Sequence, residues 1–213
     1  MNPIYEIELK YLVEPVNIIS SKVTKTEIYS QQKFYNEFCE KYHTYTWIYT
    51  DGSVDPILNT LGMGVHIPSL EYNFSAKLFS HTQICNDEII AINKAVSICI
   101  EKNINKAIIF TDSQSAIQKI NNKTLKVVNG CSGMTKRLIL EAKNINLDII
   151  IAWIPGHSGV LGNIKADSLA NVGRCLNCPV NIKVEKDDLF LYKHSVITWV
   201  FHYTYLRQQH GIV

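Results

Sequence analysis

The run Ala107-Ile108-Ile109-Phe110-Thr111-Asp112-Ser113 decides the fold of this 213-residue chain. Its first four residues are all apolar, which is typical of a short strand with both faces of its sheet covered. Thr111-Asp112-Ser113 then favours a turn, and we predict a short helix over 115–120 directly after it. A buried strand followed by a helix indicates an α/β fold, in which helices cover the faces of the sheet.

The sequence on either side of this strand repeats the change between strand and helix. Before it, four apolar residues fall at positions i, i+3, i+7 and i+10 and predict a helix over 86–102; they are Ile89, Ile92, Val96 and Cys99. After it, we predict three elements: a helix over 132–143, a fully apolar strand over 147–153 and a helix that begins near Asn163. Because both apolar strands are reached through helices, we expect them to be parallel.

A different pattern precedes these helices. Residues 45–50 alternate aromatic and β-branched side chains and predict a strand that stops at the turn triplet Asp51-Gly52-Ser53. Residues 62–67 and 71–79 predict two more strands, and the turn at Pro68-Ser69 between them is short enough for antiparallel pairing. The strands together predict a mixed five-stranded sheet, with three antiparallel strands, then two parallel strands, and flanking helices.

We divide the chain into three parts. They are an N-terminal extension (1–45) with a helix over 27–42, a main α/β domain (46–175) and a C-terminal helical extension (176–213). An apolar stripe over 187–206 is typical of a helix that docks on a larger body.

Composition excludes two classes of protein. With 46% hydrophobic residues and a net charge of +2, the chain is too apolar and too weakly charged to be disordered throughout. The longest apolar run, over 147–154, contains Asp148 and falls far short of the ~20 residues that span a bilayer, so we expect no membrane partner. Residues 1–11 do not resemble a signal peptide, so we expect an intracellular protein of the nucleus or cytoplasm that is not secreted.

The six cysteines are scattered through apolar patterns, which fits a reducing compartment better than a disulfide framework. Cys175 and Cys178 form the only close pair in the sequence. The pair is either half of a zinc site that lacks its second pair, or two reduced cysteines at the end of a helix.

Four acidic residues lie at strand ends or helix starts, where functional side chains are often found. Two end predicted strands, and two lie in about the first turn of predicted helices; they are Asp51 and Asp112, and Glu88 and Asp167. If the two strands are parallel neighbours, their carboxyl ends open into one crevice. Carboxylates brought together there would repel one another unless a cation joined them, and an all-oxygen ligand set selects Mg²⁺ or Mn²⁺. Each residue alone is more often a turn former or a helix cap, but together their positions favour a metal site.

Four motifs follow one another over roughly residues 46–173. They are Tyr49-Thr50-Asp51-Gly52-Ser53, Glu88-Ile89-Ile90-Ala91-Ile92, Thr111-Asp112-Ser113-Gln114, and Pro155-Gly156-His157-Ser158-Gly159 through Asn163-Ile164-Lys165-Ala166-Asp167. The series resembles the ribonuclease H family. The residues of the four motifs are most similar to those in the ribonuclease H domain of non-LTR retrotransposon reverse-transcriptase polyproteins. The resemblance implies a ribonuclease H-like catalytic domain over 46–175 and a reverse transcriptase module in the same polyprotein as a partner. It leaves the oligomeric state open.

The resemblance also implies a reaction, the hydrolysis of the RNA strand of an RNA–DNA hybrid to a 3′-hydroxyl and a 5′-phosphate. It implies two Mg²⁺ ions, with Mn²⁺ as a substitute, since two divalent ions can stabilise both the attacking and the leaving oxygen. On this basis Asp51 is the bridging ligand, and Glu88 and Asp112 complete the ion nearer the leaving group. Asp167 joins Asp51 on the ion that activates water.

The remaining site residues are assigned from the same motifs. His157, in a loop between glycines, is expected to shuttle a proton or assist product release, although a lone histidine is usually a surface or packing residue. Four residues are candidate contacts to the minor groove and its 2′-hydroxyls, with turn formation as the other reading; they are Gly52, Ser53, Ser113 and Gln114. Because the net charge is small, a local basic face must grip the hybrid. Its candidates are Lys119, Lys123, Lys126, Lys136 and Arg137.

Two other functions are compatible with the same fold. The first is a catalytically silent module that only binds hybrids, against which the intact set of four acidic residues argues. The second is a nuclease or transposase of the same fold that acts on DNA. Cleavage of duplex DNA but not of hybrid would favour it.

Overall fold

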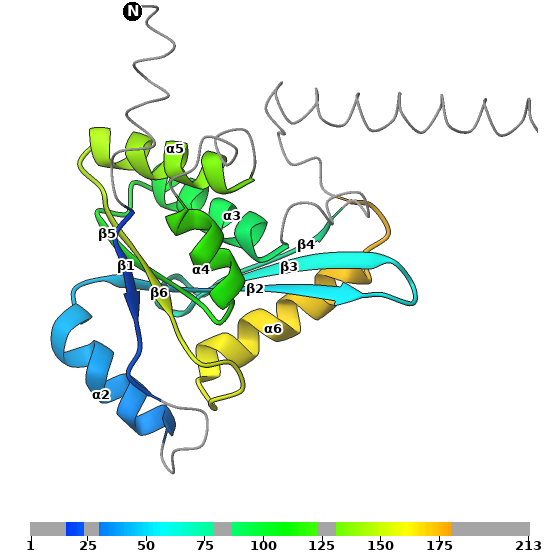
Figure 1. Cartoon of the computed structure of the whole chain (residues 1–213), viewed down its shortest axis with the longest axis horizontal. Helices are drawn as coiled ribbons and strands as arrows, with labels where there is room; N and C mark the ends of the chain where they lie inside the picture. Colours follow the sequence, from blue (N-terminus) through cyan, green and yellow to red (C-terminus); the bar gives the residue numbers. More distant parts are fainter. Residues whose placement is uncertain (1–15, 24–29, 79–86, 123–130, 180–213) are drawn as a thin grey trace, which may run out of the picture. The chain divides into compact units, whose positions relative to one another are not determined.

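The computed structural model describes residues 16–23, 30–78, 87–122 and 131–179, which form one mixed sheet with helices on both faces (Figure 1). The elements follow the chain as β1 (Ile18–Ser20), α2 (Ser30–Tyr42), β2 (Thr46–Asp55), β3 (Thr60–Ile67), η1 (Pro68–Leu70), β4 (Tyr72–Leu78), α3 (Asp87–Glu101), β5 (Lys106–Thr111), α4 (Gln114–Asn121), α5 (Cys131–Asn144), β6 (Asp148–Trp153) and α6 (Leu161–Arg174). No helix in these ranges is long and apolar enough to cross a membrane. The helix predicted over 187–206 lies outside the described residues.

The sheet joins an antiparallel half to a parallel half. Its strand order is β1-β6-β5-β2-β3-β4. Strands β2, β3 and β4 pair antiparallel, as their short connections predict. Strand β5 pairs parallel with both β2 and β6, as the helical crossovers predict. The mixed α/β sheet is therefore confirmed.

The sheet has six strands, one more than the sequence predicts. The additional strand is β1, which pairs parallel with β6 and aligns Ile18 with Ile151. Three residues are too few to show the alternation that identifies a strand, so the sequence pattern gave no reason to separate them from the N-terminal extension. Strand β1 continues the sheet at its parallel end.

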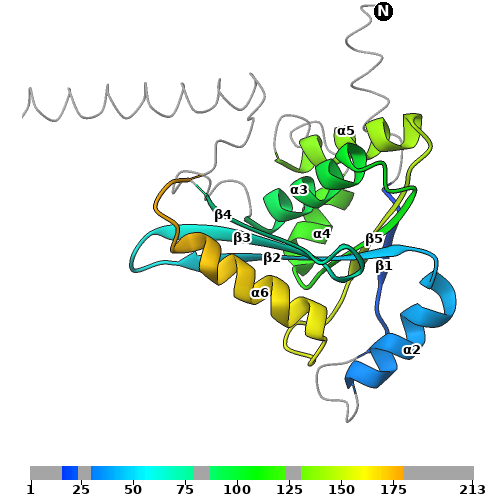
Figure 2. The ribbon, with the colours of Figure 1, turned by 180° about the vertical axis from the view of Figure 1, so that it is seen from behind.

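Helices cover both faces of the sheet. Helices α3, α4 and α5 lie on one face, and α2 and α6 lie on the other (Figures 1 and 2). Strand β5 contributes to both cores: Ala107 and Ile109 pack on the first face, and Ile108 and Phe110 pack on the second. All four are fully buried, which explains the continuously apolar pattern of this strand.

Strand β2 does not stop at Asp51-Gly52-Ser53, so the predicted turn at this triplet is wrong. The strand continues to Asp55 because β3 stays paired with it as far as Thr60. The chain turns only afterwards, where the Asp55 carboxylate accepts hydrogen bonds of 3.0 Å from the backbone N–H groups of Ile57 and Leu58. Ladder pairing thus overrides the local turn preference of the triplet. Parallel pairing with β5 ends earlier, at Tyr49 and Phe110, so Asp51 lies where these two strands separate.

Helix α6 packs directly against the backbone of β3. A Cβ at Gly64 would lie 2.2 Å from the carbonyl oxygen of Ala166, and one at Gly62 would lie 2.3 Å from that of Ala170, so only glycine permits this approach. The helix begins at Leu161, two residues earlier than predicted. Asp167 therefore lies in the second turn of the helix, not in the first.

Candidate active site

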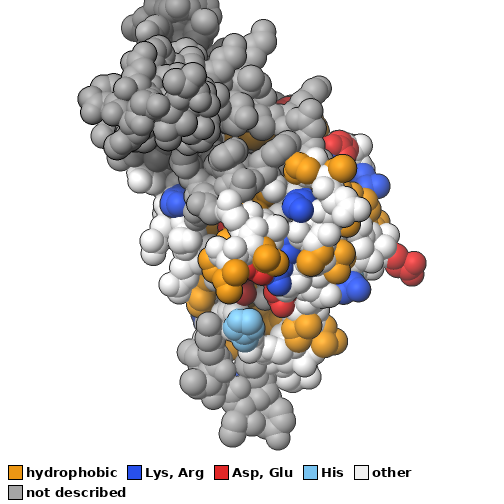
Figure 3. Space-filling view, turned by 90° about the vertical axis from the view of Figure 1, so that its right-hand side faces the viewer, with side chains coloured by type: hydrophobic (Ala, Val, Ile, Leu, Met, Phe, Trp, Pro, Cys, Tyr) orange, Lys and Arg blue, Asp and Glu red, His pale blue; other side chains and the backbone are white. Residues whose placement is uncertain are grey.

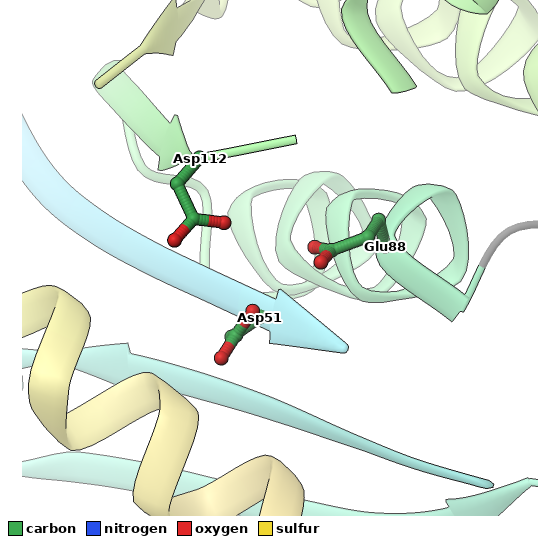
Figure 4. Close-up of side chains that lie close together, drawn as sticks. All are labelled: Asp51, Glu88 and Asp112. Carbon is green, nitrogen blue, oxygen red and sulfur yellow. The ribbon is translucent and has the colours of Figure 1, made fainter. Parts of the chain in front are cut away.

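Asp51, Glu88 and Asp112 meet at the point where β2 and β5 separate. One carboxylate oxygen of each lies within 4.8 Å of the others, and Figure 4 shows the three side chains converging from β2, the start of α3 and the end of β5. The register explains the meeting of the two aspartates. Since Tyr49 is aligned with Phe110 in a parallel pair, the residues two positions further along each strand lie side by side.

Burial and crowding make this cluster costly to ionise. The side chain of Asp51 is almost fully buried, and its pKa is raised, first by burial and then by the charges of Asp112 and Asp167. The pKa of Glu88 is also raised, first by burial and then by Asp51 and Asp112. Without a cation, the folded protein therefore retains protons on groups that would be ionised in water.

The donor set fits a hard divalent cation. One carboxylate oxygen of Glu88, Oε2, is buried and has no hydrogen-bond partner among the described residues. A buried carboxylate oxygen without a partner is costly, and like charges around it add to the cost. Oxygen ligands without histidine or cysteine suit Mg²⁺ or Mn²⁺, and such an ion would satisfy the oxygen and offset the repulsion.

Asp167 stands beside the three-residue cluster. It lies close enough to Asp51 to share a side-chain hydrogen bond and to raise the pKa of Asp51. Its Oδ1 accepts a hydrogen bond of 2.9 Å from the Asn171 amide nitrogen, one helical turn further along α6. The structure thus brings all four predicted carboxylates together, with Glu88 carried by α3 and Asp167 by α6.

Asp51, Asp112 and Asp167 line a cleft of about 240 Å³, and the exposed His157 lines it as well. His157 is exposed and has a φ of 55°, a left-handed conformation that is uncommon outside glycine. The loop around it is held by the Ser158 hydroxyl, which donates a hydrogen bond of 2.6 Å to the carbonyl of Pro155. The backbone thus presents the imidazole to the cleft, where the sequence places it.

The four candidate contacts to the minor groove differ in what their side chains already do. The Ser53 hydroxyl donates to Asn171 Oδ1 at 2.9 Å, and the Ser113 hydroxyl caps α4 by accepting from the N–H of Ala116 at 3.2 Å. The side chain of Gln114 is exposed. Gly52 is half-buried, with no room for a Cβ beside α3. The N–H of Gly52 already donates to Asp51 Oδ1 at 3.0 Å. Gln114 is therefore the best placed of the four to meet a ligand.

The candidates for the basic face differ in their exposure. Lysine and arginine side chains stand around a group of acidic side chains and a histidine on the face shown in Figure 3. Lys119 is exposed on α4. Lys136, however, is buried, and its ammonium group donates to the carbonyl of Asn122, so its inclusion in a surface grip is wrong. Lys123 and Lys126 lie outside the described residues.

Two asparagines of α6 that the sequence analysis did not assign to the site also contact its carboxylates. Asn163 donates a hydrogen bond of 3.1 Å to Asp112 Oδ2, and Asn171 donates to Asp167. Asn163, Asp167 and Asn171 are spaced four residues apart, which places them on one face of the helix. This spacing is visible in the sequence and was the signal available to find them.

Comparison with known proteins agrees with this geometry. The family model described as RNase H matches residues 43–174. The proteins named Ribonuclease H1 from Rattus norvegicus, Homo sapiens and Mus musculus are each 30% identical to the chain over 122 residues, which is 53% of this chain. The chain spans 39% of the length of each of these relatives. With a mixed sheet of this order, a convergent set of carboxylates and a family match over most of its length, the chain belongs to the RNase H family.

Proposed function

We propose that this chain is a ribonuclease H, a metal-dependent endonuclease that hydrolyses the RNA strand of RNA–DNA hybrids. The observation that carries the proposal is the convergence of Asp51, Glu88 and Asp112. Asp51 and Asp112 also line a cleft, together with Asp167 and His157. Membership of the RNase H family supports the reaction class. The clustered carboxylates have no evident use in a module that only binds nucleic acid, because they would repel its phosphates.

The four carboxylates hold the metal ions in this proposal. Mg²⁺, or Mn²⁺ in its place, supplies positive charge that stabilises the attacking and leaving oxygens and lowers the pKa of the attacking water. Asp51 interacts with both Glu88 and Asp167, which suits it to hold two ions at once. Glu88 and Asp112 would then hold the ion nearer the leaving 3′ oxygen, and Asp167 would hold the ion that activates water.

His157 is assigned to proton movement or product release. Water attacks the phosphorus, the bond from phosphorus to the 3′ oxygen breaks, and the 3′ oxygen gains a proton to become a hydroxyl. The water's oxygen remains on the 5′-phosphate. An exposed imidazole at the rim of the cleft can carry a proton between these oxygens and bulk water without being a metal ligand.

Selection of RNA is assigned to contacts with the 2′-hydroxyl. The backbone of Gly52 and the exposed side chain of Gln114 flank the carboxylates on β2 and α4. The Gln114 amide offers hydrogen-bonding groups that can distinguish a ribose from a deoxyribose in a wide minor groove. The Gly52 N–H already donates to Asp51 Oδ1, so Gln114 carries this assignment. Ser53 and Ser113 take part indirectly: Ser53 holds the Asn171 amide, and Ser113 caps the helix α4 that carries Gln114.

The wider context is also part of the proposal. The residues of the four motifs support an origin in a non-LTR retrotransposon polyprotein. A reverse transcriptase module would then be a partner, and the nucleus or cytoplasm would be the compartment. The main domain over 46–175 would carry the catalysis. Residues 1–45 and 176–213 would be extensions of it, although β1 and α2 already pack on the sheet.

Cleavage of matched duplexes tests the proposal. RNA–DNA, RNA–RNA and DNA–DNA duplexes of one sequence are incubated with the protein and Mg²⁺, with a chelator and with the Asp51→Asn variant as controls. We expect cuts in the RNA strand of the hybrid only, with 3′-hydroxyl and 5′-phosphate ends, and none in either control. Binding of hybrid without cleavage would favour the silent module, and cleavage of duplex DNA would favour a DNA-acting enzyme.

A further inference from the structure

Asp167 is held in place by a short chain of hydrogen bonds that crosses from α6 to β2. The Asn171 amide nitrogen donates to Asp167 Oδ1 at 2.9 Å and to the Asp167 carbonyl at 3.0 Å. The Asn171 amide oxygen accepts from the Ser53 hydroxyl at 2.9 Å. Asn171 and Ser53 are both half-buried, so these bonds are partly shielded from water.

These hydrogen bonds with Ser53 and Asp167 permit only one orientation of the Asn171 amide. If the amide were flipped, its oxygen would face the Asp167 carboxylate and two acceptors would repel each other. The Ser53 hydroxyl favours the observed orientation because it offers a donor to the amide oxygen. Ser53 lies two residues after Asp51 on β2, so both side chains point to the same face of the strand. Hydrogen bonds through Ser53 and Asn171 therefore connect the strand that carries Asp51 to the side chain of Asp167.

The chemistry of the donor also matters. A lysine or arginine beside Asp167 would form an ion pair and compete with a metal ion for the carboxylate. The asparagine amide is neutral, so it fixes Oδ1 without cancelling the negative charge. The other carboxylate oxygen is left to act as a ligand in the cleft.

We propose that Asn171, oriented by Ser53, is a positioning residue that holds Asp167 ready to bind a divalent cation. This inference rests on the proposed function of the site and assigns Ser53 to the support of a metal ligand instead of to contact with substrate. Groups that orient metal ligands commonly change metal affinity or activity by about 10–100-fold when they are removed.

The test measures metal binding apart from catalysis. Mn²⁺ binding to the protein without nucleic acid is followed by electron paramagnetic resonance, and the Mg²⁺ concentration for half-maximal hybrid cleavage is measured in parallel. Asn171→Leu, which keeps the size of the side chain, should weaken Mn²⁺ binding about 10-fold and raise the Mg²⁺ requirement similarly. Ser53→Ala should cause about a 3-fold loss, in keeping with one neutral hydrogen bond.

Two further variants make the result specific. In the Asn171→Leu background, Ser53→Ala should add no further loss, since Ser53 acts through Asn171. Asn177→Leu, the same substitution at an exposed position after the end of α6, should match the wild type. Unchanged Mn²⁺ binding and Mg²⁺ requirement in Asn171→Leu would overturn the inference, as would additive losses in the double variant. If circular dichroism shows Asn171→Leu to be unfolded, Ser53→Ala alone decides, and wild-type behaviour there refutes the positioning role.

Failure of the proposed function would be recognised separately. A wild-type protein that binds Mn²⁺ but cuts no hybrid refutes the proposed activity, while the Mn²⁺ affinities of the variants still decide the role of Asn171. A wild-type protein that cuts hybrid while all variants share its metal dependence refutes only the positioning role.

Discussion

Replacing Asp51 by asparagine should stabilise the protein when no metal is present. The carboxylate oxygens lie within 4.8 Å of one another, and at an effective dielectric constant of about 20 two full charges at that separation repel by about 3.5 kcal/mol. Sharing of protons, which the raised pKa values indicate, reduces this cost in the wild type. We therefore expect Asp51→Asn to raise the free energy of unfolding by about 1–3 kcal/mol at pH 8, or the midpoint of thermal unfolding by about 2–10 °C.

The gain should depend on pH in a defined direction. The pKa of Asp51 in the folded state lies above that of an unfolded aspartate, which is about 4. Stability linked to this group is therefore fully present below that pH and is lost as the pH rises through the folded-state pKa. The advantage of Asp51→Asn should consequently shrink toward pH 5, where Asp51 and Glu88 are already protonated in the folded wild type.

Thermal unfolding with chelator and with Mg²⁺, at pH 5 and pH 8, measures these effects. Mg²⁺ should stabilise the wild type and leave Asp51→Asn almost unchanged, because binding to the folded state alone shifts the unfolding equilibrium. Glu141→Gln removes an exposed carboxylate on α5 and is the matched control, for which we expect no change. A variant Asp51→Asn that is less stable than the wild type at pH 8 without metal would refute the account of a strained acidic cluster.

Three other outcomes follow from the same geometry. Asp112→Asn should reduce hybrid cleavage by at least ~10²–10³-fold while circular dichroism stays native, and near-normal rates in this variant would contradict the metal-site assignment. His157→Ala should lower turnover by about 10–100-fold yet leave hybrid binding without metal unchanged, whereas full activity would return His157 to a structural role. Gly64→Ala should destabilise the fold by about 1–3 kcal/mol in chemical denaturation, because its Cβ would lie 2.2 Å from the Ala166 carbonyl oxygen, and an unchanged midpoint would argue against that contact.

The parts of the fold that depend on burial were predictable from sequence. The continuous apolar run at 107–110 predicts a strand covered on both faces, and the structure confirms it. The helix over 86–102 was likewise visible as an apolar stripe and appears as α3. Periodicity reports how a segment meets the core, and here the core decides the structure.

Features that depend on a partner distant in sequence were not predictable in the same way. Asp51-Gly52-Ser53 has the composition of a turn but is held extended by β3, and Ile18–Ser20 becomes a strand only because β6 offers it an edge. Lysine is usually exposed, but Lys136 is buried against Asn122. In each case a tertiary contact outweighs local preference.

The candidate site shows the same division. The four carboxylates could be proposed because their residue type and their places at element ends are written in the sequence. The roles of Asn163 and Asn171 depend on which face of α6 meets the sheet, and that is set by the contact with β3. Asparagine is also common on exposed helix surfaces, so its identity alone carries no signal.

The contact between α6 and β3 has a consequence for how this protein can be altered. Because Gly62 and Gly64 bring two backbones together, the separation between Asp51 and Asp167 is set by main-chain dimensions and not by the sizes of core side chains. Substitutions in the two hydrophobic cores can therefore change stability while the spacing of the ligands stays constant. A single added methyl group at Gly64 would instead push the whole helix outward and carry Asn163, Asp167 and Asn171 with it. Core substitutions can thus change stability at constant ligand spacing, whereas substitutions at the glycines of β3 change both.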